Sequence, residues 1–431
     1  MKCWSDERRV VVTGLGVVCP LGLTLDDLWR SLTQPLHTLS QSVANGAIAG
    51  FQGRIDDFGP LTPVARKSLR KALKLMNRAT QLGVAAAQRA LADSALSSNW
   101  YEPHRVGVSF GAGNVSVMPE DFVAGIHACL DEQDQFDFAR WGTDGIPKVA
   151  PLWMLRCLPN MPACHLSIIN DFRGPNNTIT QRGAAANLAI AEAFHLICDG
   201  DADAMITGAC GTALEPFNLL HGRMDNELGE KTGSSSEPCR PFDLRRTGPP
   251  PAEAAGALVL EELCSATERG ATIYGEIRAA ASSCVPARDS FGACQKAMQN
   301  ALRLTLGQTR IAPENIGHVH AHGLGTRQSD IAEAQAIRRI FGRQADRLPV
   351  VAAKGHMGNA SAGSGAIEIA GSLLALRRGS LFPVRNYEQP DPDCPVLPVT
   401  GDDVAAGTSF LNLNMTAGGV ATCLAIEAWA A

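Results

Sequence analysis

The sequence has little of what marks a membrane or secreted protein. No uninterrupted apolar stretch is long enough to cross a bilayer, and acids and bases precede the first apolar run, unlike in a secretory signal. There is no low-complexity segment and no acidic or basic tail. We therefore expect a globular protein of the cytoplasm, with no membrane partner.

The chain also has no large excess of positive or negative charge and no closely spaced pair of cysteines. A formal net charge of −5 over 431 residues gives little support to a nucleic-acid surface. The 13 cysteines include no CxxC pair, so reduced thiols are favoured over disulfides or a zinc site. We expect neither a metal nor a cofactor.

What the sequence does contain is an alternation of strands and helices. Residues 8–22 are a β-branched run ending in Gly-rich turns, and residues 24–32 begin with a Thr cap and early acids, as a helix does. Apolar residues recur at helical spacing through residues 70–96. Further short buried strands are expected at 105–113, 202–211 and 256–263.

The pattern restarts after residue 268. Strands are expected at 271–283 and 316–323, and helices at 291–309 and 329–342. The chain is too long for one ordinary core. We predict a layered α/β sandwich with two similar lobes, residues 1–268 and 269–431.

Several stretches together resemble one family, the β-ketoacyl-acyl-carrier-protein synthases of fatty acid and polyketide assembly. They are "RRVVVTGLGVVCPLG", "LRCLPNMPACHLSI", "GPNNTITQRGAAANLAI", "DGDADAMITGA", "RPFDLRR", "GALVLEEL", "AHGLGTRQSDIAEAQAI", "KGHMGNASAGSGAIE" and "NYEQPDPDC". The resemblance covers residues 8–428 in the family's order. It implies the thiolase-like fold, a five-layered αβαβα sandwich of two related halves that usually works as a dimer.

The family places a nucleophilic Cys after a Gly-Pro pair and seven intervening residues, and a Gly follows seventeen residues beyond that Cys. Gly174, Pro175 and Gly200 keep this spacing, so the resemblance puts Gly183 at the nucleophile position. A thiolate at a helix N-terminus accepts acyl groups because the dipoles lower its pKa, whereas Gly cannot be acylated. A slip of two residues would instead place Gln181 there, a residue that chain-length-factor homologues often carry.

Two further family elements concern hydrogen-bond donors. The His in "AHGLGT" corresponds to His322, which the family uses as a neutral donor to the thioester oxygen and the enolate. The element Lys, three residues, Gly-His supplies Lys354 and Gly358 here and replaces its His by Asn359. His356 lies three residues too early to substitute. Asn359 can donate an amide N–H but cannot titrate.

Supporting residues are carried over in the same way. Lys354 and Glu333 resemble the family's buried Lys/Glu support, which is equally an ion pair that holds two helix starts. Glu253 is retained where the family has a Gly-rich loop. In the C-terminal gate, Met415 takes an aromatic position while Gly418 and Gly419 remain. This smaller gate suggests a pocket that no longer needs timed access.

A basic cluster lies in the stretch "ARKSLRKALKLMNR". It contains Arg66, Lys67, Arg70, Lys71, Lys74 and Arg78. Residues three or four apart share a helix face. The resemblance implies that this face docks the acidic acyl carrier protein; a merely solvated helix face is the alternative.

These departures favour a non-condensing subunit, similar to a chain-length factor, in fatty acid or type II polyketide biosynthesis. Its partners would be acyl carrier protein and a second subunit, in a homodimer or in a heterodimer with a Cys-containing ketosynthase. Two alternatives stay open. One is an acyltransferase or malonyl decarboxylase that uses His322 and Asn359 without a covalent intermediate, and the other is an acyl- or carrier-binding scaffold.

Overall fold

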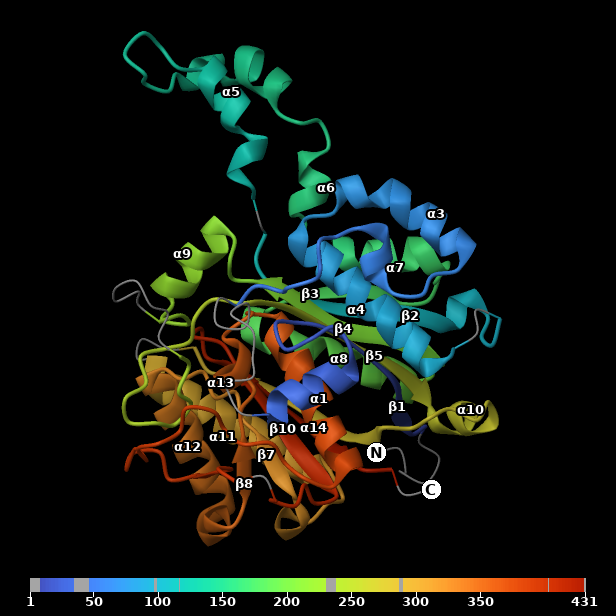
Figure 1. Ribbon diagram of the computed structural model, residues 1–431, viewed down its shortest axis with the longest axis vertical. Coiled ribbons are helices and arrows are strands. Elements are labelled where there is room, and N and C mark those ends of the chain that lie inside the picture. Colours follow the sequence, from blue (N-terminus) through green and yellow to red (C-terminus); the bar gives the residue numbers. More distant parts are fainter. Residues whose placement is uncertain are drawn as a thin grey trace.

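The structure, a computed structural model (Figure 1), describes residues 8–34, 46–96, 99–115, 117–229, 238–286, 290–401 and 403–429. These residues form an α/β fold with a large mixed sheet and helices packed on its faces. None of the helices in these ranges has the length and apolarity that a bilayer crossing requires.

The predicted opening of strand then helix is confirmed. β1 (Val10–Val18) is buried along its whole length, and α1 (Leu25–Thr33) follows it. The Thr24 hydroxyl accepts a hydrogen bond from the backbone N–H of Asp27 at 3.1 Å, which satisfies one unpaired donor of the first helical turn.

The strands form one sheet, in which corresponding strands of the two halves lie at matching distances on either side of the β1–β6 junction. From one edge it runs β3-β2-β4-β5-β1-β6-β11-β10-β7-β8, with the two-residue β9 beyond. The strands after β1 are β2 (Val106–Ala112), β3 (Asn176–Thr180), β4 (Ala204–Thr212), β5 (Glu253–Glu262), β6 (Gly275–Cys284), β7 (His318–His320), β8 (Pro349–Val351), β9 (Leu397–Pro398), β10 (Ser409–Met415) and β11 (Val420–Glu427). The first five strands and their counterparts in the second half thus occupy mirrored places, although the division at residue 268 stays a prediction.

The two halves of the sheet have the same pattern of strand directions. β3, β2 and β4 are parallel neighbours, and β5 and β1 are antiparallel to theirs. In the second half β8, β7 and β10 are parallel neighbours, and β11 and β6 are antiparallel to theirs. Three residue pairs between β1 and β6 join the halves.

Helices complete the five layers. α4 (Arg78–Ser94) and α7 (Met161–Asn170) pack on the outer face of the first half-sheet, while α11 (Ser290–Gln308) and α12 (Arg327–Phe341) cover the second. Between the half-sheets lie α8 (Ala185–Cys198) and α14 (Gly363–Arg378), which contact each other and strands of both halves. The remaining helices are α3 (Pro63–Ala72), α5 (Val123–Ala128), α6 (Trp153–Cys157), α9 (Pro216–Met224), α10 (Leu263–Glu268) and α13 (Lys354–Met357).

Small residues bring helix α4 unusually close to strand β1. A side-chain carbon on Gly16 would lie 2.0 Å from the Ala86 carbonyl oxygen, and one on Gly14 would lie 2.4 Å from that of Ala90. Only residues without a Cβ permit this approach. The alanine-rich sequence of α4 therefore reports tight helix-on-sheet packing.

The helical spacing through residues 70–96 does not produce one continuous helix. α3 ends at Ala72, a short 3₁₀ turn follows, and Met76 is extended. The Asn77 side chain then accepts a hydrogen bond from Thr80 N–H at 2.9 Å and caps a new helix. The break re-aims every side chain beyond it, including one that the sequence had placed in the basic cluster.

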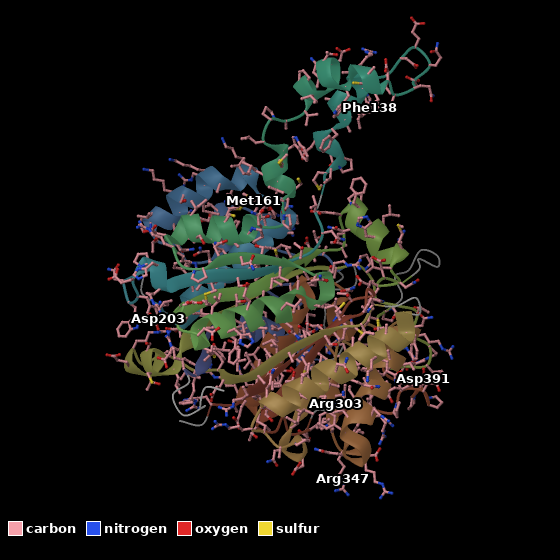
Figure 2. All side chains as sticks on the ribbon, turned by 180° about the vertical axis from the view of Figure 1, so that it is seen from behind. Phe138, Met161, Asp203, Arg303, Arg347 and Asp391 are labelled. Carbon is pink, nitrogen blue, oxygen red and sulfur yellow. The ribbon has the colours of Figure 1, made fainter. Side chains whose placement is uncertain are left out.

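A segment between β2 and α7 stands off the body of the molecule (Figures 1 and 2). It carries α5 and α6 and presents large apolar side chains to solvent, with Phe138 at 78% exposure. We call residues 117–157 the arm.

Candidate active site

Gly183 lies where strand β3 turns into helix α8. Arg182 begins a 3₁₀ turn that leads into α8, and its φ of 43° is uncommon for a non-glycine residue. Gly183 is buried, and a side-chain carbon built on it would lie 3.3 Å from Cε1 of His322. A nucleophile at position 183 would therefore stand beside this imidazole, as the family pattern requires.

The alternative register is less compatible with this geometry. Gln181 is exposed and lines a pocket on the surface rather than the cavity of His322. The place of Gly183 beside the His322 ring favours position 183, and its assignment to the nucleophile stays a prediction.

The space beside Gly183 is not empty. The carbonyl oxygen of Met415, at the end of β10, lies 2.7 Å from the place where a side-chain carbon would be. Such a contact is too short for a real Cβ, and the neighbour is backbone, which cannot swing aside as a side chain can. A side chain at position 183 would therefore force the Met415 backbone to move.

The backbone and imidazole of His322 are held from two sides. Glu333, on α12, accepts the N–H groups of His322 and Gly323 at 2.7 and 2.8 Å. The Lys354 Nζ lies 3.3 Å from His322 Nδ1 and donates to the His322 carbonyl at 2.7 Å. Burial, and then the Lys354 charge, lower the pKa of His322 well below its usual value. The imidazole is therefore neutral, and with Nδ1 facing the ammonium it presents Nε2–H as a donor.

The prediction that Lys354 and Glu333 form an ion pair is wrong. Lys354 pairs instead with Glu368 of α14, and both side chains are fully buried. Asn414 also donates to Glu368, at 2.6 Å. Both carboxylate oxygens of Glu333 accept hydrogen bonds from the two backbone N–H groups, and burial raises the pKa of Glu333 to about 8. Lys354 is thus the link between the His322 turn and the central helix.

The side chain of Asn359 already makes hydrogen bonds through both its amide nitrogen and its oxygen. Its amide donates to the Glu227 carbonyl at 3.0 Å, and its side-chain oxygen accepts the Ser361 N–H at 2.9 Å. The structure places it in a different cavity from His322. The two predicted donors therefore do not converge on one space.

Glu253 and Arg78 form a structural pair. The Arg78 guanidinium meets the Glu253 carboxylate at 2.8 and 2.6 Å, and Glu253 also accepts the Ile48 N–H at 3.1 Å. Arg78 is therefore not a member of the exposed basic cluster. This is the side chain that the break before α4 turns inward.

The other basic residues lie on or just after α3. Lys67, Arg70, Lys71 and Lys74 are exposed, while Arg66 is ion-paired with Asp56 at 2.6 Å. Their role in docking a carrier protein stays a prediction.

The residues predicted to form the C-terminal gate lie near His322, and their role as a gate stays a prediction. Met415 is buried and lines the cavity of His322, whereas Gly418 lines the surface pocket. Gly419 has φ of 81° and lies in the turn between β10 and β11, a conformation that favours glycine.

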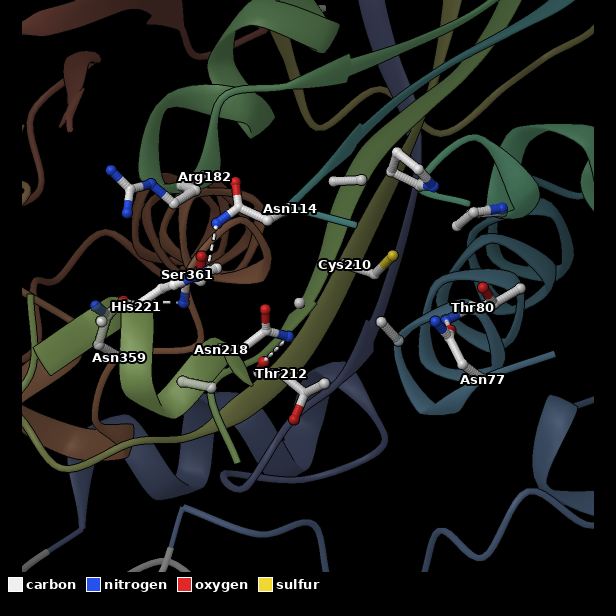
Figure 3. A pocket seen from close by; sticks show the side chains of 18 of the residues that line it. Asn77, Thr80, Asn114, Arg182, Cys210, Thr212, Asn218, His221, Asn359 and Ser361 are labelled. Atoms are coloured by element: carbon white, nitrogen blue, oxygen red, sulfur yellow. Dashed lines mark hydrogen bonds between the residues drawn. The ribbon is translucent and has the colours of Figure 1, made fainter. Parts of the chain in front are cut away.

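Three cavities surround this constellation. The outer cavity, of about 570 Å³, is lined by His322, Arg327 and Gln328 among others. The inner cavity, of about 50 Å³, has Arg182, His221 and Asn359 at one end and Asn77 and Thr80 at the other (Figure 3). The surface pocket, of about 600 Å³, lies along Gln181 and Gly418.

Sequence reasoning missed three charged residues here: Arg182, Glu227 and Glu368. Glu368 closes the quoted motif "KGHMGNASAGSGAIE", so its position after Lys354 was a usable signal. Arg182 precedes the nucleophile position directly. Glu227 comes from a distant loop, and nothing in its neighbours in the sequence marks it.

Comparison with known proteins identifies the family. The model for the beta-ketoacyl synthase N-terminal domain matches residues 7–266, and that for the C-terminal domain matches residues 274–388. The 3-oxoacyl-[acyl-carrier-protein] synthase 2 of Synechocystis sp. is 30% identical over 94% of this chain and 95% of its own length. The tetracenomycin polyketide synthase ketoacyl synthase alpha subunit of Streptomyces glaucescens is 30% identical over 90% of this chain and 89% of its own. The chain belongs to the beta-ketoacyl synthase family.

Solved structures agree on the fold. A beta-ketoacyl synthase from Burkholderia phymatum superposes with a TM-score of 0.79 at 25% identity, covering 98% of this chain and 100% of that one. The ishigamide ketosynthase/chain length factor gives a TM-score of 0.78 at 22% identity, covering 99% and 100%. The thiolase-like α/β fold is thereby confirmed.

Proposed function

We propose that this chain is a non-condensing, chain-length-factor-like subunit that pairs with a Cys-bearing ketosynthase in fatty acid or type II polyketide biosynthesis. One observation carries the proposal: at position 183, beside His322, the chain has no side chain and no room for one because of the Met415 carbonyl. Condensation by the family's route needs a covalent acyl-thioester at this point.

The thiols that line the inner and outer cavities do not replace the missing one. Cys294 lines the outer cavity, and Cys157 and Cys210 line the inner cavity. Burial raises the pKa of all three, that of Cys210 to about 12. Because the thiolate is the nucleophile, a raised pKa makes each of these thiols less reactive near neutral pH than a free cysteine.

The surface supports pairing with a second chain of the same fold. β3 is the edge strand of the sheet and its side chains are half-buried or exposed, so its outer edge is open to an added strand. The arm presents large exposed apolar side chains: Val123, Ile126, Phe136, Phe138, Ile146, Leu152 and Met154. Apolar surface of this extent is typical of an interaction site. The pairing named for the ishigamide structure is what we extend to this chain.

The test is co-expression with a Cys-bearing ketosynthase of the same organism, followed by labelling with an acyl carrier protein that carries a radioactive acyl group. We expect a stable complex in which label is attached to the partner and none to this chain. A homodimer of this chain that itself takes up label at a thiol would sink the proposal.

The two other hypotheses have less support. Turnover without a covalent intermediate was expected to use His322 and Asn359 together, but they line different cavities and Asn359 is already engaged. A decarboxylation assay on the isolated chain and on His322→Ala tests what remains of it. Acyl binding with neither turnover nor a partner would point to the scaffold.

A further inference from the structure

One carboxylate in the outer cavity has no role in the site described so far. The Glu227 side chain is only 10% exposed and lines this cavity together with His322. Its Oε1 accepts the Ala417 N–H at 3.3 Å. None of the residues that the structure describes donates a hydrogen bond to its Oε2. Glu227 therefore keeps an accepting position for a molecule that enters the cavity.

Two chain segments bring Glu227 toward His322. The Arg182 Nη2 lies 3.8 Å from Glu227 Oε1, and the next residue is Gly183, where a side-chain carbon would lie 3.3 Å from the His322 ring. Ala417, which donates to Glu227, lies in the turn after β10 and lines the same cavity. The carboxylate and the imidazole thus face one space from neighbouring walls.

The charges around Glu227 leave a carboxylate that is more basic than usual. Burial raises the pKa of Glu227. The Arg182 guanidinium, the Ala417 N–H and the Lys354 ammonium oppose this rise, while the Asp225 carboxylate adds to it. A carboxylate with a raised pKa takes up a proton more readily than an ordinary one, which is what a general base requires.

His322 supplies the complementary group. Its Nδ1 lies 3.3 Å from the Lys354 ammonium, so the neutral ring has Nε2–H as its donor. Such a donor stabilises the negative charge that develops on a carbonyl oxygen under attack. The outer cavity, of about 570 Å³, is within the range of about 300–1,000 Å³ that small-molecule sites have. It thus holds a donor for a carbonyl oxygen and a base for a water molecule.

We propose that the outer cavity hydrolyses acyl thioesters, with Glu227 as general base and His322 as donor to the thioester carbonyl. Glu227 takes a proton from water while the water oxygen bonds to the carbonyl carbon. The carbon–sulfur bond then breaks, and the proton passes from Glu227 to the leaving thiolate. One thioester and one water give one carboxylic acid and one thiol, with no oxidation or reduction and no covalent bond to the protein.

This activity goes beyond the proposed pairing and needs no thiol at position 183. It rests on one assumption of the proposed function, that the outer cavity receives an acyl thioester. It does not use Asn359, which lines a different cavity. A non-condensing subunit with such a site would release acyl chains as free acids.

The test measures hydrolysis of hexanoyl-N-acetylcysteamine, with the hexanoate product determined by mass spectrometry. The protein is the full chain, alone and in complex with a ketosynthase whose nucleophilic Cys is replaced by Ala. We expect hydrolysis faster than in buffer. Glu227→Gln keeps the size of the side chain and the acceptor for Ala417 but cannot take up the proton, so kcat should fall at least about 100-fold with little change of KM.

A second variant and the pH profile separate a base from a structural group. Glu227→Asp keeps a carboxylate on a shorter side chain and should recover part of the rate, also if Glu227→Gln folds poorly. The wild-type rate should rise with pH to a plateau, because the base must be ionised. The inflection is expected above the ordinary glutamate pKa of about 4.3 and should be missing in Glu227→Gln.

Glu262→Gln is the matched control. Glu262 is 8% exposed and also accepts a backbone N–H, that of Ser265 at 2.9 Å. It lines none of the three cavities. This variant should keep the wild-type rate.

The outcomes separate this inference from the proposed function. Hydrolysis no faster than in buffer, an unchanged rate in Glu227→Gln, or an equal loss in Glu262→Gln would each overturn the role of Glu227, even if the chain co-purifies with a ketosynthase. Glu227-dependent hydrolysis by a chain that has no partner would leave this activity standing and remove the pairing.

Discussion

A side-chain carbon on Gly183 would lie 2.7 Å from the carbonyl oxygen of Met415 and 3.3 Å from the ring of His322. The first distance forbids the carbon and the second places it at the imidazole. A side chain at position 183 would thus point at the imidazole but has no space. Restoring a thiol there is a change of packing as well as a change of chemistry.

Gly183→Cys is therefore expected to stay inactive in condensation and to destabilise the fold by about 1–3 kcal/mol, because overpacking forces the Met415 backbone to move. Urea unfolding and an acyl-labelling assay measure the two effects. Gly418→Ala is the matched control: the nearest atom to its added carbon is 3.7 Å away, so its stability should be nearly unchanged. Gly183→Cys that folds as well as the wild type and carries an acyl group would contradict the packing argument.

The Lys354–Glu368 pair allows a second prediction. Lys354→Met should destabilise the chain by about 3–5 kcal/mol, because it leaves the fully buried Glu368 carboxylate without its cation. Replacing both partners by Met should recover much of that loss. For comparison, Arg173→Ala removes a surface pair whose side chains are 66% and 64% exposed and should cost under about 1 kcal/mol. Equal losses in the buried and surface variants would show that Lys354 is not the structural link we infer.

The exposed basic face on α3 predicts charge-dependent carrier binding. Lys67→Glu/Lys71→Glu should weaken binding of an acidic acyl carrier protein at least about tenfold at low salt, and the difference should shrink at high salt as the charges are screened. Arg343→Glu/Arg347→Glu makes the same change of charge on other exposed residues. If both double variants bind equally well, the α3 face is only a solvated helix surface.

Acidification should destabilise the protein through its buried histidines. Burial lowers the pKa of five of them, and four of these lie in the second half of the chain: His318, His320, His322 and His356, with a pKa of about 4 for His318 and about 3 for His356. An unfolded histidine takes up a proton below about pH 6.5 while these do not. Their contribution is therefore present above pH 6.5 and is lost as the pH falls toward 4, by about 1.4 kcal/mol per pH unit for each histidine.

The check is the urea midpoint between pH 7.5 and 5. Replacing one of the four, as in His356→Asn, should make the pH dependence shallower whatever it does to the stability at pH 7.5. An identical slope in the variant and the wild type would mean that this histidine is protonated in the folded state as well.

Local sequence determined most of the elements, because strand and helix signals are carried by neighbouring residues. Short stretches of sequence were enough to predict the β-branched run of β1, the Thr24 cap of α1 and the Gly-Pro spacing before Gly183. The helix break at residues 73–77 was not, because apolar spacing continues across it and only the Asn77 cap marks the restart.

Pairing between distant residues was decided by the tertiary structure alone. Two buried carboxylates, those of Glu333 and Glu368, lie near Lys354. Helix α14 packs against β10, where Asn414 also donates to Glu368, and this packing makes Glu368 the partner of Lys354. Likewise, the amino-acid sequence alone shows that position 183 has no thiol. Arg182 meets Glu227, 45 positions further along the chain, through tertiary packing within the first half. That the Met415 carbonyl closes the space beside Gly183 depends on how the two halves pack, which no local pattern encodes.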